Sequence, residues 1–168
     1  DHPLLPTTTT DGRGTQTDFA YTDHGQVASR TDAANVEPGT HPHLPRTTSW
    51  EYHDDFPGLV TSRAVPSTAG GGAIRTTEWL RDASGNPTTR RITGVERGSA
   101  FSHDTVSTFN AAGQPLTSDP PEHGTADETS WSYTPPDPAD PDRGGLYPFS
   151  RTDPILSSIG GDTLFAYD

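Results

Sequence analysis

The chain contains no cysteine and no lysine, and it has few apolar side chains. Without cysteine there can be no disulfide, no thiolate nucleophile and no cysteine-ligated zinc site. The longest apolar runs cover a few residues, far fewer than the ~20 that span a bilayer. Hydrophobic residues make up 28% of the 168 positions. Such a composition leans toward disorder and argues against a compact enzyme with a large core.

The charge balance is strongly acidic. The formal net charge is −12, and all 11 basic residues are arginine, against 23 acidic residues. Self-repulsion of this size opposes collapse while it favours solubility. Because other polyanions are repelled as well, we expect no nucleic acid partner and no membrane insertion by this segment.

The N-terminal sequence DHPLLPTTTT lacks the basic and apolar regions of a secretory signal, and it does not begin with methionine. We interpret the chain as an interior piece of a longer polypeptide. Any targeting signal is then expected outside it.

One pattern recurs along the chain: Thr, any residue, an aromatic slot, any residue, a second aromatic slot. Both slots are aromatic in four copies, at residues 17–21 (TDFAY), 48–52 (TSWEY), 129–133 (TSWSY) and 163–167 (TLFAY). Two degraded copies lie at 77–81, with Arg81 in the second slot, and at 105–109, with Ser107 in the first. Ten of the fourteen aromatic residues occupy these slots. With a copy about every 30 residues, we interpret the pattern as a true repeat of five units and the start of a sixth.

Each unit is predicted to be a β-hairpin. The period of two places Thr17, Phe19 and Tyr21 on one face of a half-buried strand. In three copies a glycine follows four residues after the second slot, where it supplies the positive φ of a tight hairpin loop. These glycines are Gly25, Gly85 and Gly113. Polar runs rich in Thr, Ser and Arg follow at 26–32, 86–94 and 114–120, and they predict the returning strands.

Two copies have longer turns. In the second, Gly58 lies six residues after Tyr52. In the fifth, the loop that begins at 134 carries four prolines, which cannot donate to a ladder, so we expect it to leave the sheet before strand 146–154. Stretches 35–46 and 65–75 are rich in Pro and Gly and are predicted to be connectors. We see no domain boundary, so 1–168 is predicted to be a single repeat array.

Several of these residues resemble the YD repeat of RHS proteins. They are Phe-x-Tyr-Asp at 165–168, the Tyr-x-x-x-Gly spacing of Tyr21 and Gly25, and the SRTD segments at 29–32 and 150–153. The resemblance covers nearly the whole chain. It implies an all-β fold in which consecutive β-hairpins pair into a long, curved, mostly antiparallel spiral sheet. RHS polymorphic toxins, toxin-complex shell subunits and teneurins have such arrays; the self-cleaving aspartyl site of the RHS shell core has no match here.

The function that the resemblance implies is structural. The chain would be a non-catalytic segment of a large secreted or cell-surface protein, whose sheet forms a shell or scaffold that encloses or presents other domains. Its partners would be neighbouring repeats of the same polypeptide, with an enclosed toxin domain or cell-surface carbohydrate as further candidates. We expect no catalytic residues, no cofactor and no metal.

Four motifs suggest a metal, calcium, hydrolase or phosphate-binding site, and for each we favour an ordinary loop or strand segment without such a site. The HPH motif at His41 and His43 offers two metal ligands, but no third ligand follows at useful spacing. The acidic run 137–142 is interrupted by prolines where a calcium loop needs oxygen ligands. His103 and Asp104 lie near serines but without a Gly-x-Ser-x-Gly elbow. The glycine run 69–73 lacks the Lys-Ser/Thr of a phosphate-binding loop.

The tryptophans carry the main functional alternative. Trp50, Trp79 and Trp131 share the first slot with Phe19 and Phe165, which favours a role in packing between hairpins. If one face of the sheet is uncovered, they could instead stack on sugar rings or on a partner protein, as in an adhesin. A second alternative follows from the low hydrophobic content alone, and in it the chain is a disordered Pro/Thr/Gly-rich spacer.

Overall fold

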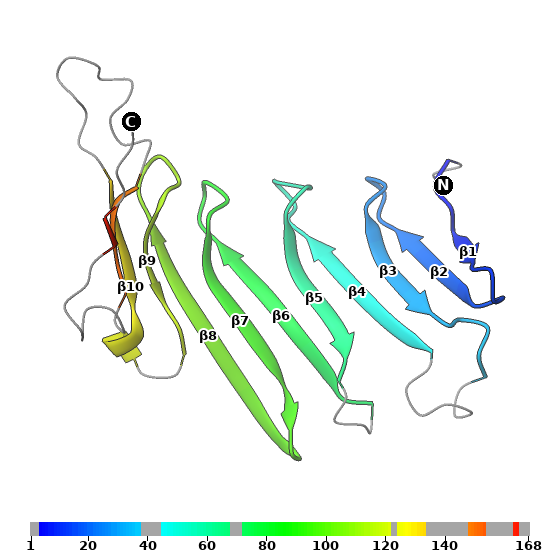
Figure 1. Cartoon of the computed structure of the whole chain (residues 1–168). Coiled ribbons are helices and arrows are strands. Elements are labelled where there is room, and N and C mark those ends of the chain that lie inside the picture. Colours follow the sequence, from blue (N-terminus) through cyan, green and yellow to red (C-terminus); the bar gives the residue numbers. More distant parts are fainter. Residues whose placement is uncertain are drawn as a thin grey trace. The chain divides into compact units, whose positions relative to one another are not determined.

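The structure is a computed structural model, and it describes residues 4–37, 45–67, 72–121, 124–133, 148–153 and 163–164. These residues form an all-β fold (Figure 1). The strands are β1 (Thr8–Thr10), β2 (Gln16–Tyr21), β3 (Val27–Asp32), β4 (Arg46–Tyr52), β5 (Val60–Pro66), β6 (Ile74–Arg81), β7 (Pro87–Glu96), β8 (Ser99–Phe109), β9 (Pro115–Asp119), β10 (Thr129–Tyr133), β11 (Pro148–Thr152) and β12 (Thr163–Leu164). A short 3-10 helix, η1 (Gly124–Asp127), precedes β10.

The order of the strands in the sheet is their order in the chain, from β1 to β12. The described pairs are antiparallel, for example β2 with β3, β4 with β5, and β10 with β11. The all-β class and the edge-to-edge pairing of consecutive hairpins are therefore confirmed. No helix among the described residues is long and apolar enough to cross a membrane.

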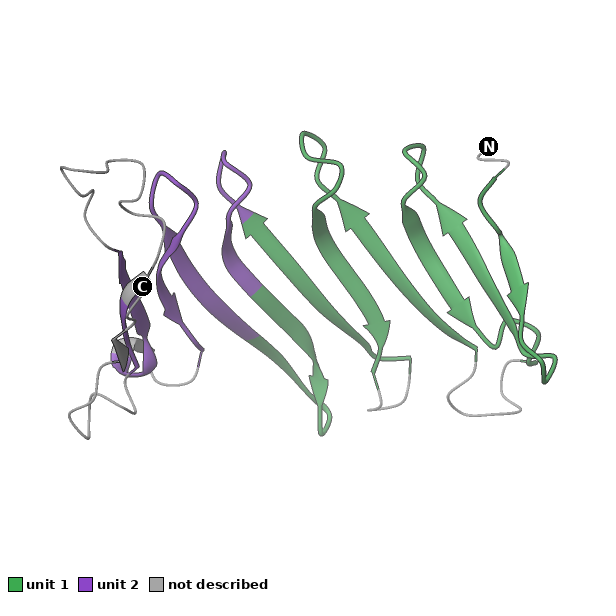
Figure 2. Ribbon diagram, turned by 45° about the horizontal axis from the view of Figure 1, so that its top comes forward, with its two compact units in different colours: residues 1–80, 91–102 green, residues 81–90, 103–168 purple. Residues whose placement is uncertain are grey.

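The chain divides into two compact units (Figure 2). Unit 1 comprises residues 1–80 and 91–102, and unit 2 comprises residues 81–90 and 103–168.

Three of the predicted hairpins close with the same turn, which also joins β1 to β2 between Asp11 and Thr15. In the first, the Thr22 amide donates to the Gln26 carbonyl at 2.8 Å, and the Gly25 amide donates to the Thr22 carbonyl at 2.9 Å. The same two bonds recur from residue 82 to 86 and from 110 to 114. Gly25, Gly85 and Gly113 have φ values of 79°, 84° and 77°. The predicted role of these glycines is confirmed, because a residue with a Cβ resists this conformation.

The turn of the second hairpin is different. It runs from His53 to Leu59, and the Leu59 amide donates to the Phe56 carbonyl at 2.8 Å. Gly58 does not adopt a positive φ. The longer turn thus closes without a left-handed glycine.

A β-bulge adjoins the turn of four hairpins, whereas β1 and β2 pair without a register shift. Tyr21 pairs with Val27 while Ala20 pairs with Ser29, so one residue of the returning strand is skipped. The register shifts in the same way at Glu51/Tyr52, Thr108/Phe109 and Ser132/Tyr133. A bulge at this place increases the local twist of these four hairpins.

The junctions between hairpins have a constant register. The Thr that opens one copy lies opposite a fixed position of the preceding returning strand, which is Arg in three cases. The pairs are Arg30↔Thr48, Arg63↔Thr77, Ser118↔Thr129 and Arg151↔Thr163. Because the first aromatic slot lies opposite that same position within a hairpin, as in Phe19↔Arg30, each hairpin is displaced by two residues from the one before. Two residues are about 6.8 Å along a strand and two strand spacings are about 9.6 Å, so the strands are tilted by about 35° from the perpendicular to the stacking direction.

Three ordered features were not predicted. Strand β1 forms from a threonine tract and joins β2 through a turn in which Asp11 accepts hydrogen bonds from the Arg13 and Thr15 amides. Strands β7 and β8 meet in a two-residue turn, Arg97 and Gly98, both with positive φ. The predicted connector 65–75 was too long, because β5 extends to Pro66 and β6 begins at Ile74.

The sheet has almost no buried interior among its described residues. Ala33 is the one fully buried hydrophobic residue, and no large side chain is completely buried. Leu80, Ile74 and Val106 are about half exposed. A single layer of strands leaves both faces accessible, which explains how a sequence with 28% hydrophobic residues can form it.

Candidate binding face

One face of unit 1 carries the slot aromatics, and we call it the aromatic face. Strand alternation and the described registers assign the side chains to it. On β2 to β6 its larger side chains are Phe19, Tyr21, Arg30, Asp32, Arg46, Trp50, Tyr52, Arg63, Val65, Arg75 and Trp79. All five aromatic side chains among them are half-buried.

Among the described residues, no ring pair joins the slots of successive hairpins. The described ring pair among the slots, Phe19 with Tyr21 at 6.4 Å, lies within one strand. Slots of successive hairpins are two strands apart, with an arginine-bearing strand between them. Phe19 lies opposite Arg30 and Trp50 opposite Arg63. In unit 2, the Arg151 guanidinium lies 6.0 Å from the centre of the Trp131 ring.

The second-slot tyrosines join neighbouring hairpins through their hydroxyls. The Tyr52 hydroxyl donates to the Val27 carbonyl at 2.9 Å, and the Tyr133 hydroxyl donates to the Pro115 carbonyl at 2.8 Å. Both acceptors are the first residue after the turn of the preceding hairpin. Partial burial raises the pKa of Tyr133 above its ordinary value of 10.0. A tyrosine in the second slot can therefore bond to the preceding hairpin, whereas a phenylalanine in this slot has no hydroxyl with which to do so.

The residue after the second slot holds the turn. The Asp82 carboxylate accepts hydrogen bonds from the Ser84 and Asn86 amides, both at 2.9 Å, and from the Asn86 side chain at 2.9 Å. These bonds, above all those from Asn86, lower the pKa of Asp82 below its ordinary value of 3.8. Asn110 accepts in the same way from the Ala112 and Gln114 amides. In the long turn, His53 Nδ1 accepts from the Asp55 and Phe56 amides.

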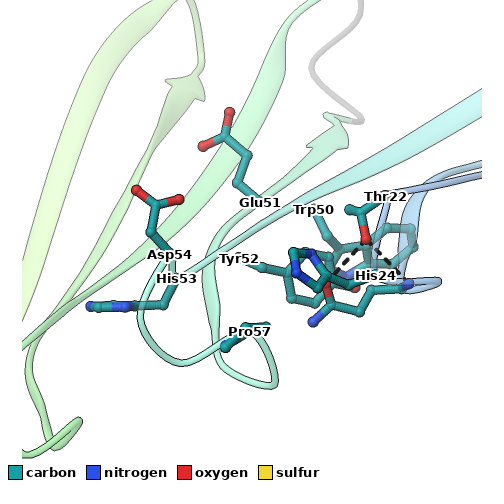
Figure 3. A pocket seen from close by; sticks show the side chains of 9 residues that line it. Thr22, His24, Trp50, Glu51, Tyr52, His53, Asp54 and Pro57 are labelled. Carbon is teal, nitrogen blue, oxygen red and sulfur yellow. Dashed lines mark hydrogen bonds between the residues drawn. The ribbon is translucent and has the colours of Figure 1, made fainter.

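A pocket of about 360 Å³ lies between the first and second turns of unit 1. It is lined by Thr22, His24, Gln26, Trp50, Glu51, Tyr52, His53, Asp54 and Pro57 (Figure 3). The Glu51 and Asp54 carboxylates point away from the Trp50 and Tyr52 rings in Figure 3. The pocket thus combines an aromatic wall with hydroxyl, amide and imidazole groups, a combination that suits a small polar ligand.

Charge is segregated between the two faces of strands β2 to β6. Within unit 1 the aromatic face of these strands carries four arginines, Arg30, Arg46, Arg63 and Arg75, and one acidic residue, Asp32. The opposite face of the same strands carries Asp18, Glu51 and Glu78 and no basic residue. An acidic chain thus presents one face that is positively charged. This segregation cannot be read from the net charge.

The motifs singled out in the sequence do not gather into a site. His103 and Asp104 are consecutive residues of β8, so their side chains project to opposite faces of the strand. His41, His43 and the acidic run 137–142 lie outside the described residues, as do Phe165 to Asp168. Within the described part of the chain, no group of three His, Cys, Asp or Glu residues could hold a metal ion.

Sequence reasoning missed the arginines. The signal was present, because Arg30, Arg63 and Arg90 each lie four residues after the turn-closing residues Gln26, Leu59 and Asn86. Only the bulge and the pairing register show that this position shares a face with the aromatic slots.

No protein-family model matches the chain, and no curated protein matches it at a significant level. The likeness to the YD repeat therefore rests on the residues themselves.

Proposed function

We propose that the chain is a non-catalytic structural segment of a larger RHS-type surface or toxin protein. In this role the hairpins build a sheet that encloses or presents other domains of the same polypeptide.

The repeated junction is the observation that supports this role. The same pairing of the opening Thr with one position of the preceding returning strand occurs at four junctions, two of which involve unit 1 and two unit 2. A junction that is the same each time allows hairpins to be added without limit, as in other repeat arrays. A catalytic site would instead need residues that differ from copy to copy.

Electron microscopy of the polypeptide encoded by the complete reading frame tests the proposal. We expect a hollow or extended β-sheet particle in which residues 1–168 form part of the wall. A compact globular enzyme, with this segment folded around an active site, would contradict the proposal.

Carbohydrate binding is a second candidate, and the pocket beside Trp50 and Tyr52 favours it. The half-buried Trp50 ring can stack on a sugar, while His24 and Gln26 can hydrogen-bond to its hydroxyls. Tryptophan fluorescence of the wild-type chain and of Trp50→Phe, titrated with neutral oligosaccharides, tests this function. Quenching that the variant loses supports it, and an unresponsive wild-type spectrum excludes it.

The disordered spacer receives no support from the described residues, because their strands pair in defined registers. Far-UV circular dichroism separates the two readings of the composition. A cooperative melt of β signal is expected for the sheet, and a coil or polyproline signal without a melt is expected for the spacer.

A further inference from the structure

We propose that Arg63 and Arg75 form a carboxylate-binding site on the aromatic face of unit 1, which takes an aspartate or glutamate side chain of a partner polypeptide. The inference goes beyond the scaffold role, since it holds whether or not the sheet forms a shell.

The chain contains its own template for such a site. At the first junction, an Arg30 guanidinium nitrogen lies 2.6 Å from an Asp32 carboxylate oxygen. Asp32 also lies directly opposite Arg46 on β4. One carboxylate is thus ion-paired with the arginine of its own strand and faces a second arginine on the neighbouring strand, whose guanidinium donates to the Pro66 carbonyl at 3.3 Å.

The second junction repeats the arginines and lacks the carboxylate. Arg63 holds the position that Arg30 holds at the first junction, and Arg75 holds the position of Arg46. Val65 lies opposite Arg75, just as Asp32 lies opposite Arg46. Diagonal neighbours of this kind lie about 7–8 Å apart, so one carboxylate can reach both guanidinium groups. A partner's acidic side chain would supply the group that Asp32 supplies at the first junction.

Both arginines are available. They are exposed, and among the described residues neither forms an ion pair. Arginine binds carboxylate through parallel N–H donors, which makes two arginines at neighbouring positions of adjacent strands a directional site for such a group. In unit 2 the pair Arg151 and Asp153, 3.1 Å apart, again satisfies the arginine internally.

The surroundings favour a polypeptide over a uniform polyanion. Apolar groups flank the two arginines: Val65 lies opposite Arg75, Trp50 lies opposite Arg63, and the Phe101 ring is packed against Gly94 beside the Arg75 backbone. A nucleic acid or a sulfated glycan that continued along the sheet would meet Asp32 at the next junction. An isolated acidic side chain with apolar neighbours fits this local pattern better.

Fluorescence anisotropy with a labelled peptide tests the site on the full chain. The probe alternates glutamate and valine, and its control has glutamine in place of glutamate. We expect the glutamate peptide to bind at least about tenfold more tightly than the control, with an affinity that falls as salt is added. Arg63→Gln/Arg75→Gln should weaken binding of the glutamate peptide by about tenfold or more.

Two further variants make the test specific. Arg13→Gln/Arg97→Gln removes the same charge from two turns and should leave the affinity within about twofold. Val65→Asp restores the internal carboxylate of the template and should abolish binding while it retains both arginines; a melting curve checks that it is folded. Equal binding of the two peptides, or an unchanged affinity of a folded Val65→Asp, would overturn the proposal. So would displacement of the peptide by heparin or an oligonucleotide that binds more tightly.

Discussion

At the scale of single residues, two polar positions shape the described hairpins. A tyrosine in the second slot, as at Tyr52 and Tyr133, bonds to the preceding hairpin, and the residue after the slot, as at Asp82 and Asn110, closes the hairpin's own turn. The pattern of slots could be predicted from the sequence, since alternation and spacing are local. The hydroxyl bonds could not, because Val27 and Pro115 become acceptors only through the displacement between hairpins.

Removal of the Tyr52 hydroxyl tests the bond between hairpins. Tyr52→Phe keeps the ring and loses the bond to the Val27 carbonyl, so the free energy of unfolding should fall by about 1 kcal/mol in urea titrations. Phe109→Tyr is the reciprocal variant, because Phe109 holds the same slot and Pro87 is the equivalent acceptor. It should gain stability; a loss in Phe109→Tyr would show that the bond is not a general property of the slot.

The carboxylate of Asp82 should make stability depend on pH. Its pKa is lowered in the folded chain, so its contribution is complete above the ordinary value of 3.8 and is lost as the pH falls through the lower folded value. Asp11 acts in the same direction, because bonds from the Thr15 and Arg13 amides lower its pKa. Asp82→Ala should lower the melting temperature at pH 7, and Asp82→Asn, which resembles Asn110, should change it little. Thermal melts at pH 7 and below pH 4 measure both effects, and a melting temperature that rises on acidification contradicts the assignment.

At the scale of the element, the hairpin is the unit that the sequence specifies best. The glycine turns and returning strands were predicted correctly because they depend on neighbouring residues. Strand β1 was missed because Thr8 to Thr10 have no aromatic slot, and it is ordered by its pairing with β2. The bulges and the two-residue displacement were missed because they are properties of pairs of strands.

Alanine substitutions at two glycines of adjacent hairpins test whether a turn with positive φ requires glycine. Gly25→Ala places a Cβ at φ 79° and should cost about 1–2 kcal/mol of unfolding free energy. Gly58→Ala is the matched control, since Gly58 has no positive φ and no atom within 4 Å of an added Cβ. It should stay within about 0.5 kcal/mol of the wild type. Equal losses in the two variants would mean that the turn conformation is not what requires Gly25.

At the scale of the whole molecule, the protein combines a low hydrophobic content with an ordered sheet. Backbone ladders, turn clamps and tyrosine bonds order the described residues, while half-buried rings replace a closed core. The two faces differ in charge although the chain as a whole has a net negative charge, so the net charge alone is a poor guide to what the sheet binds. The charge difference between the faces follows only from the pairing register, which assigns each arginine to one face.

The constant junction is the central claim, and NMR measures it most directly. Interstrand NOEs between backbone protons should connect Arg30 with Thr48 and Arg63 with Thr77 in unit 1, and Arg151 with Thr163 in unit 2. NOEs that instead connect Arg30 with Trp50 and Arg63 with Trp79 would remove the two-residue displacement. That result would contradict the account of how each hairpin is joined to the next.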